Sequence, residues 1–199
     1  FARMLLEASI IVGTVGKPDR QLQLLERVSA TAAKTADANL LSEVECYVAS
    51  VLYDKDLAAA KARYARGREA QSGAARAGSD AKITCDRAEA LLQASSGDSA
   101  GAIVAFERIL ERYGSDPAMS VGTRIALLTD IGLLHYRADN TAGALAAMER
   151  SLRLLDEAGR GRSMTKVLTM VNMAAVLARG GEVLAASRQQ QAAIDLLQQ

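Results

Sequence analysis

The sequence predicts an all-α protein built as a solenoid of about five antiparallel helix pairs, and three observations support this prediction. Good helix formers such as Ala, Leu, Arg, Glu and Gln are abundant, whereas the 199 residues include only 5 Tyr, 2 Phe and no Trp. Apolar residues recur at the i, i+3, i+4, i+7 spacing of amphipathic helices. A motif of a small residue, a helical run, a polar turn and an alanine twelve positions on recurs along the chain.

The period of this motif is 42 residues. The small residues Ala90, Gly132 and Ala174 share this spacing, and so do the alanines that follow them. Stepping back by one period reaches Val48 and Ala60, so four units share one register. A looser fifth unit comes first, with Ser9 at the small position. Internal repeats of this length indicate stacked helix pairs, because one pair alone cannot bury both of its faces.

Each unit is expected to hold two helices joined by a short turn. The first helices are predicted at 2–14, 38–53, 80–95, 118–138 and 164–179. The second helices are predicted at 18–34, 56–77, 99–113, 141–158 and 182–197. Proline in the first turn at Pro18 costs no hydrogen bond, and a Gly stop followed by a Ser or Asp cap separates the later units.

One domain covering 1–199 is expected, with units at about 1–36, 37–78, 79–115, 116–160 and 161–199. Small residues such as Gly132 facing Ala144 allow the paired helices to approach to about 8 Å. Large side chains at Tyr64, Phe106 and Met148 then fill the gap to the next unit. The last unit has Gln190 at this position, so its second helix is predicted to be a polar cap with no sixth unit beyond it.

These residues resemble the tetratricopeptide repeat (TPR), in the positions Ile131-Gly132, His135, Ala144 and Met148. The 42-residue period and Val171-Asn172-Met173-Ala174 are similar to the long repeats of kinesin light chain and of bacterial regulators. The resemblance implies a right-handed superhelix that binds a protein or peptide on the concave face of its first helices. Departures from the family pattern are the missing Trp and the His135 that stands where the family has Tyr.

Helical spacing within this implied groove gives the candidate peptide-binding residues. They are Glu45, Tyr53, Arg87, Leu91, Asp130, Leu133, Arg137, Asn172 and Arg179. Asn172 is the leading candidate because an amide can both donate to and accept from a peptide backbone. The alternative for Asn172 is a hydrogen bond within its own repeat. The arginines either hold a ligand carboxylate or phosphate, or pair with Glu45 and Asp130 as solvated ions.

Catalytic and metal chemistry find little support in the sequence. His135, the only histidine, is predicted to be a buried core residue rather than a base, and no cofactor or metal site is expected. Cys46 and Cys85 are expected to stay unpaired in a reducing compartment. The basic runs 61–68 and 159–162 are interpreted as solvated surface rather than as nucleic-acid sites.

The overall composition points to a non-catalytic scaffold. A formal net charge of +1 favours neither nucleic acid nor an anionic membrane as partner, and no apolar run reaches the roughly 20 residues of a spanning helix. A cytoplasmic location is expected, and homodimer formation is left open. The chain begins and ends inside helical patterns, which suggests a segment of a longer protein. The alternative function is therefore the sensory or regulatory segment of a bacterial kinase, cyclase or transcription regulator.

Overall fold

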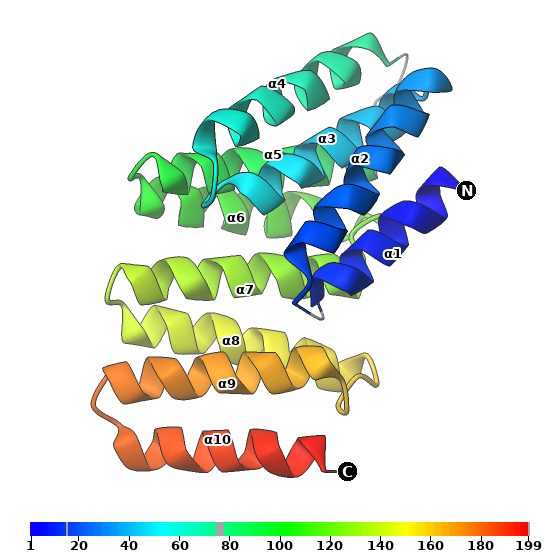
Figure 1. Ribbon diagram of the computed structural model, residues 1–199. Coiled ribbons are helices and arrows are strands. Elements are labelled where there is room, and N and C mark those ends of the chain that lie inside the picture. The colour runs from blue at the N-terminus through cyan, green and yellow to red at the C-terminus, as the bar shows by residue number, and fades with distance from the viewer. Residues whose placement is uncertain (15, 75–77, 199) are drawn as a thin grey trace. The chain divides into compact units, whose positions relative to one another are not determined.

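The computed structural model describes residues 1–14, 16–74 and 78–198, and within this part of the chain the regular structure is entirely α-helical. Within these ranges, ten helices form five consecutive antiparallel pairs (Figure 1). The first helices of the pairs are α1 (Ala2–Thr14), α3 (Ala38–Leu52), α5 (Ser79–Ser95), α7 (Val121–Arg137) and α9 (Met164–Arg179). The second helices are α2 (Pro18–Lys34), α4 (Leu57–Gly73), α6 (Ser99–Tyr113), α8 (Thr141–Glu157) and α10 (Val183–Leu197). These bounds confirm the all-α prediction and most of the predicted helix ends.

The chain forms two compact units, Phe1–Met119 with α1 to α6 and Ser120–Gln199 with α7 to α10. In the first unit α3 packs against both α4 and α5, and the core includes Leu6, Leu25, Val28 and Val44. In the second unit Met148 of α8 packs with Val176 of α9. Each unit therefore has an apolar core of its own.

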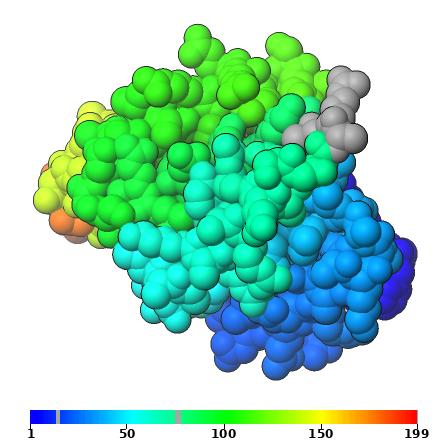
Figure 2. Space-filling view, turned by 90° about the horizontal axis from the view of Figure 1, so that it is seen from above, coloured from blue at the N-terminus to red at the C-terminus, as the bar shows by residue number. Residues whose placement is uncertain are grey.

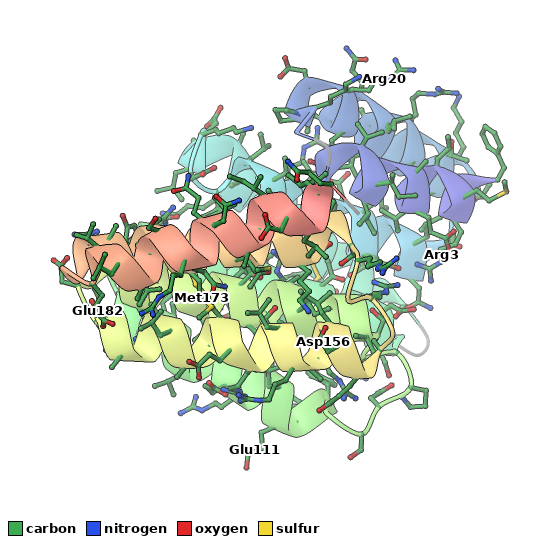
Figure 3. All side chains as sticks on the ribbon, turned by 90° about the horizontal axis from the view of Figure 1, so that it is seen from below. Arg3, Arg20, Glu111, Asp156, Met173 and Glu182 are labelled. Carbon is green, nitrogen blue, oxygen red and sulfur yellow. A yellow bond between two sulfur atoms is a disulfide. The ribbon has the colours of Figure 1, made fainter. Side chains whose placement is uncertain are left out.

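The second helices begin at N-cap residues that follow the 42-residue period. The carboxylates of Asp56 and Asp98 and the amide oxygen of Asn140 each accept a hydrogen bond from the backbone N–H three residues on, at 2.8–2.9 Å. Such a bond satisfies one of the helix's unpaired N–H groups. Glu182, the fourth residue in this register, makes no side-chain cap bond. Figure 3 labels it at the turn before α10.

The turns before Asp98, Asn140 and Glu182 reverse the chain through a residue with positive φ. Gly97, Asp139 and Gly181 have φ values of 96°, 56° and 84° and are again 42 residues apart. Glycine adopts this region without a Cβ clash, and Asp tolerates it better than most residues. The repeat is therefore encoded at the level of backbone conformation as well as by apolar spacing.

Glycine also allows the turn to pack tightly against the preceding helix. A Cβ at Gly143 would lie 2.7 Å from Nδ1 of His135, and a Cβ at Gly101 would lie 2.3 Å from the Gln93 amide nitrogen. His135 accepts a hydrogen bond at Nδ1 from the Asn140 amide, 3.2 Å away. His135 is half-buried, so the prediction of a buried core histidine is wrong in degree. Its ring lies against Gly143 in the first turn of α8.

The large residues predicted to fill the gaps between units are inside. Phe106 and Met148 are 0% and 2% exposed, while Tyr64 is half-buried. The predicted polar cap is wrong, however, because α10 exposes several large apolar side chains. Val183, Leu184 and Leu197 are 67%, 80% and 57% exposed. Gln190 identified one polar position but not the apolar face beside it.

The cysteines also depart from expectation. Cys46 of α3 and Cys85 of α5 form a disulfide, with their Cα atoms 4.9 Å apart. They are separated by 39 residues in the sequence but lie on neighbouring first helices. The prediction that they stay unpaired is therefore wrong.

The periodic caps give a stability prediction. We expect Asn140→Ala to lower the free energy of unfolding by about 1 kcal/mol, because the Gly143 N–H loses its acceptor, and Asn140→Asp to retain most of the stability. We expect Glu182→Asn to raise stability by about 0.5–1 kcal/mol by supplying the missing cap. Urea titrations of the variants measure both effects. Equal stabilities of Asn140→Ala and wild type would show that the periodic caps carry no energy.

Candidate functional site

Glu45 is completely buried where α2, α3 and α4 meet. Its carboxylate accepts a hydrogen bond from the Ser29 hydroxyl and two from Arg63 at 3.2 Å, and it forms an ion pair with Arg66 at 3.3 Å. Arg63 also pairs with Glu26 of α2. In the space-filling view the cyan surface of α4 borders the blue surface of α2 (Figure 2).

This network changes the interpretation of Glu45 and of the basic run. A buried charge is tolerated only when it is paired and hydrogen-bonded, and this carboxylate has partners on two other helices. Glu45 is 0% exposed and so does not lie on an open groove. In the basic run at 61–68, Arg63 and Arg66 face Glu45, and Arg68 lies 3.7 Å from Asp86. The three arginines of this run thus pair with carboxylates of their own unit.

The other candidates of the first unit are partly or fully covered. Leu91 is 2% exposed and belongs to the core, which contradicts its predicted place on an accessible face. Tyr53 and Arg87 are half-buried. The Ser95 hydroxyl donates to the carbonyl of Tyr53 at 3.1 Å and so links the ends of α3 and α5.

An ion-paired cluster that the sequence did not reveal joins the three first helices of this unit. Arg3 of α1 lies 2.5 Å from Glu43 of α3 and 3.3 Å from Asp80 of α5. Burial raises the pKa of Glu43 above its ordinary value, even though the Arg3 guanidinium opposes this shift. In the sequence Arg3 is 40 residues from Glu43 and 77 residues from Asp80, so no local motif could have indicated this cluster.

A cleft of about 310 Å³ lies between α5 and α6 of the first unit. Its lining includes Glu89, Gln93, Arg108 and Arg112. Tyr113, also in the lining, donates a hydrogen bond to Asp86 at 2.9 Å. Burial, followed by this hydrogen bond, raises the pKa of Tyr113 to about 12. The phenol therefore stays protonated at neutral pH and acts as a fixed donor within the cleft.

In the second unit, Arg179 holds the ends of α7 and α9 together. Its guanidinium donates to the carbonyl of Tyr136 at 3.2 Å, lies 4.6 Å from the centre of the Tyr136 ring and pairs with Asp139. This cation–π and ionic contact occupies the planar group. Arg179 therefore links α9 to the end of α7. Its ionic partner is Asp139.

An exposed apolar surface of the second unit runs along α9. We name it the α9 stripe, and it comprises Met164, Leu168, Val171, Ala175 and Ala178, all exposed. Met164, Leu168 and Val171 are 52%, 44% and 43% exposed. The spacing of four, three, four and three residues places all five on one face of the helix. Contiguous exposed apolar surface of this kind marks interaction sites.

Asn172 lies at the edge of the α9 stripe and is half-buried. On α7, Asp130 and Leu133 are half-buried and Arg137 is exposed. The second unit thus brings five of the nine candidates, Asp130, Leu133, Arg137, Asn172 and Arg179, onto its two first helices.

The described residues were considered as metal ligands and as membrane-spanning helices. No group of three or more His, Cys, Asp or Glu side chains there could hold a metal ion. No helix within the described ranges is long and apolar enough to cross a membrane.

Comparison with known proteins identifies the fold. No protein-family model and no curated protein matches the sequence. A Signal Transduction ATPase with Numerous Domains (STAND) protein with a tetratricopeptide repeat sensor, from Pyrococcus horikoshii, is similar in structure, with a TM-score of 0.67 at 13% identity. The match covers 96% of this chain and 28% of that one. The fold is that of a tetratricopeptide-like helical repeat.

Two structures of a putative kinesin light chain with nearly identical TPR-like repeats, from Podosopora anserina, are also similar. Both are 14% identical to this chain, with TM-scores of 0.60 and 0.59. They match 98% of this chain and 93% and 94% of their own. These comparisons confirm the predicted TPR-like solenoid. The chain spans about a quarter of the length of the STAND protein.

The buried carboxylate of the TPR-like fold gives a second stability prediction. We expect Arg63→Ala to destabilise the first unit by about 3 kcal/mol, because Glu45 stays buried with its main ionic partner removed. Arg66→Ala is the matched control: its side chain is 55% exposed, so we expect a loss below about 1 kcal/mol. Chemical denaturation of both variants makes the comparison. Equal losses would mean that Arg63 has no special role in compensating Glu45.

Proposed function

We propose that the chain is a non-catalytic scaffold that binds a protein or peptide through the first helices of its repeats, and that the α9 stripe is the principal contact. The observation that carries the proposal is the combination of five exposed apolar side chains in one line with a half-buried amide beside them. The stripe would bury apolar side chains of the ligand, and Asn172 would bind its backbone.

The chemistry of the surrounding surface suits a peptide. Arg137 at the end of α7 is exposed and offers a guanidinium for a carboxylate or phosphate of the ligand. Arg179 is less available because Tyr136 and Asp139 already engage it. The candidate surface thus combines apolar area for affinity with one amide and one exposed cation for orientation.

A second candidate function is the sensory or regulatory segment of a larger signalling protein. The observation that favours it is the similarity to the STAND protein, whose repeats are described as a sensor. In that role ligand binding to the repeats would alter the activity of an attached module. The two functions predict different outcomes: a scaffold acts when the repeats are expressed alone, whereas a sensor requires the attached module.

Catalysis is not part of the proposed function. His135, the only histidine, engages the Asn140 amide at Nδ1, and no nucleophile lies within the contacts described for it. A measured turnover that is lost in a folded His135→Ala variant would overturn this part of the proposal. We also propose no nucleic-acid or membrane partner, on the basis of the net charge of +1.

Binding is tested with peptides selected by display on the folded chain. We expect Asn172→Ala and Arg137→Ala each to weaken binding about 5- to 10-fold, because each removes one or two polar contacts worth about 1 kcal/mol. Glu149→Ala is the matched control: Glu149 is exposed on α8 and is not part of the stripe, and we expect no change. Calorimetric titration measures the affinities. Unchanged affinity in both Asn172→Ala and Arg137→Ala would refute the proposed surface.

A further inference from the structure

The disulfide between Cys46 and Cys85 lies at the centre of the contact between α3 and α5. Both cysteines are 0% exposed, and so are the alanines beside them, Ala49 and Ala88. Tyr64 of α4 packs against the same cluster. Small neighbours allow the two helices to approach closely enough for the bond to form.

The helix α4 lies directly over the bond. A Cβ at Gly67 would come within 2.5 Å of the Cys46 sulfur and 3.1 Å of the Ser42 carbonyl oxygen. Gly67 is itself buried, although glycine in a helix interior costs stability relative to alanine. The absence of a side chain at Gly67 therefore leaves the space that the Cys46 sulfur of the disulfide occupies. The Ser42 hydroxyl lies 3.5 Å from the Cys85 sulfur.

We propose that Cys46–Cys85 is a permanent covalent staple between the second and third helix pairs, and that the protein matures in an oxidising compartment where this bond can form. The expected cytoplasmic location conflicts with such a bond, since buried structural disulfides form and persist outside reducing compartments. The proposal concerns formation and permanence of the bond and is independent of the ligand.

The chemistry requires a disulfide oxidant. One cysteine thiolate attacks the oxidant's disulfide, forming a mixed disulfide and releasing one oxidant thiolate. The second cysteine thiolate then attacks the mixed disulfide at the protein sulfur, which forms the Cys46–Cys85 bond and releases the second oxidant thiolate. The protein loses two electrons and two protons, and the oxidant gains them. This exchange takes place before α4 covers the sulfurs, because a reagent must approach them directly.

The staple joins two first helices, α3 and α5, that pack against each other. The 39-residue separation encloses all of α4, so the bond restricts the unfolded chain and stabilises the α3–α4–α5 arrangement. In the second unit the ends of α7 and α9 are held by Arg179 on Tyr136 and Asp139 instead. Both cysteines of the sequence are used in the one bond.

The state of the thiols in the full folded chain is the first test. The chain is refolded in a glutathione redox buffer and then exposed to excess dithiothreitol, once in native buffer and once in urea. We expect no reactive thiol in native buffer over hours and two thiols per chain in urea. Two reactive thiols after refolding, or reduction within minutes in native buffer, would overturn the proposal: the first outcome means no bond, and the second means a reversible switch.

Variants of α4 test whether the helix is shaped around the bond. We expect Gly67→Ala to lower the fraction of oxidised chain several-fold in the same redox buffer. Gly73→Ala is the matched control, because a Cβ at Gly73 meets no atom within 4 Å, and it should oxidise as wild type does.

We expect Cys46→Ala/Cys85→Ala to lower the melting temperature of the first unit by roughly 5–15 °C. Wild-type oxidation of Gly67→Ala, or an unchanged melting temperature of the double variant, would contradict the staple.

Discussion

Close approach between helices is the constraint on which the rest of the structure depends. Where the helices meet, the sequence places glycine or alanine: Ala90 and Ala102 are both fully buried, and a Cβ at Gly132 would lie 3.3 Å from the Met148 side chain. Larger side chains there would push the pair apart, and the apolar residues between units would lose their contacts. The 42-residue period is therefore a period of small residues as much as of apolar ones.

Polar groups follow from the same close packing. Because neighbouring helices cover α3 on several sides, the buried carboxylate of Glu45 takes its polar contacts from Ser29, Arg63 and Arg66. The turns are compact for a related reason: Asn140 satisfies both the start of α8 and the ring of His135.

The sequence predicted those features that are local and periodic, and missed those that depend on neighbours far along the chain. Helix starts followed from caps such as Ser163 and from Pro18, and the observed helices begin there. Helical spacing placed Glu45 on one side of α3 but could not show that α2 and α4 cover that side. Three features unite residues from different helices: the disulfide, the Arg3 cluster and the cleft beside Tyr113. The spacing of these residues in the sequence does not indicate that they lie close together in the fold. The apolar face of α10 was missed because only one polar position was considered.

The surface left after this packing determines what the chain can bind. On α9 the residues of the stripe stay apolar and exposed, with Asn172 at their edge. The most direct test is methyl NMR of the chain labelled at Met, Leu, Val and Ala, titrated with a selected peptide. The account predicts that the methyl signals of Met164, Leu168, Val171 and Ala175 shift together with saturation. Saturable binding that leaves these four signals unchanged would contradict it.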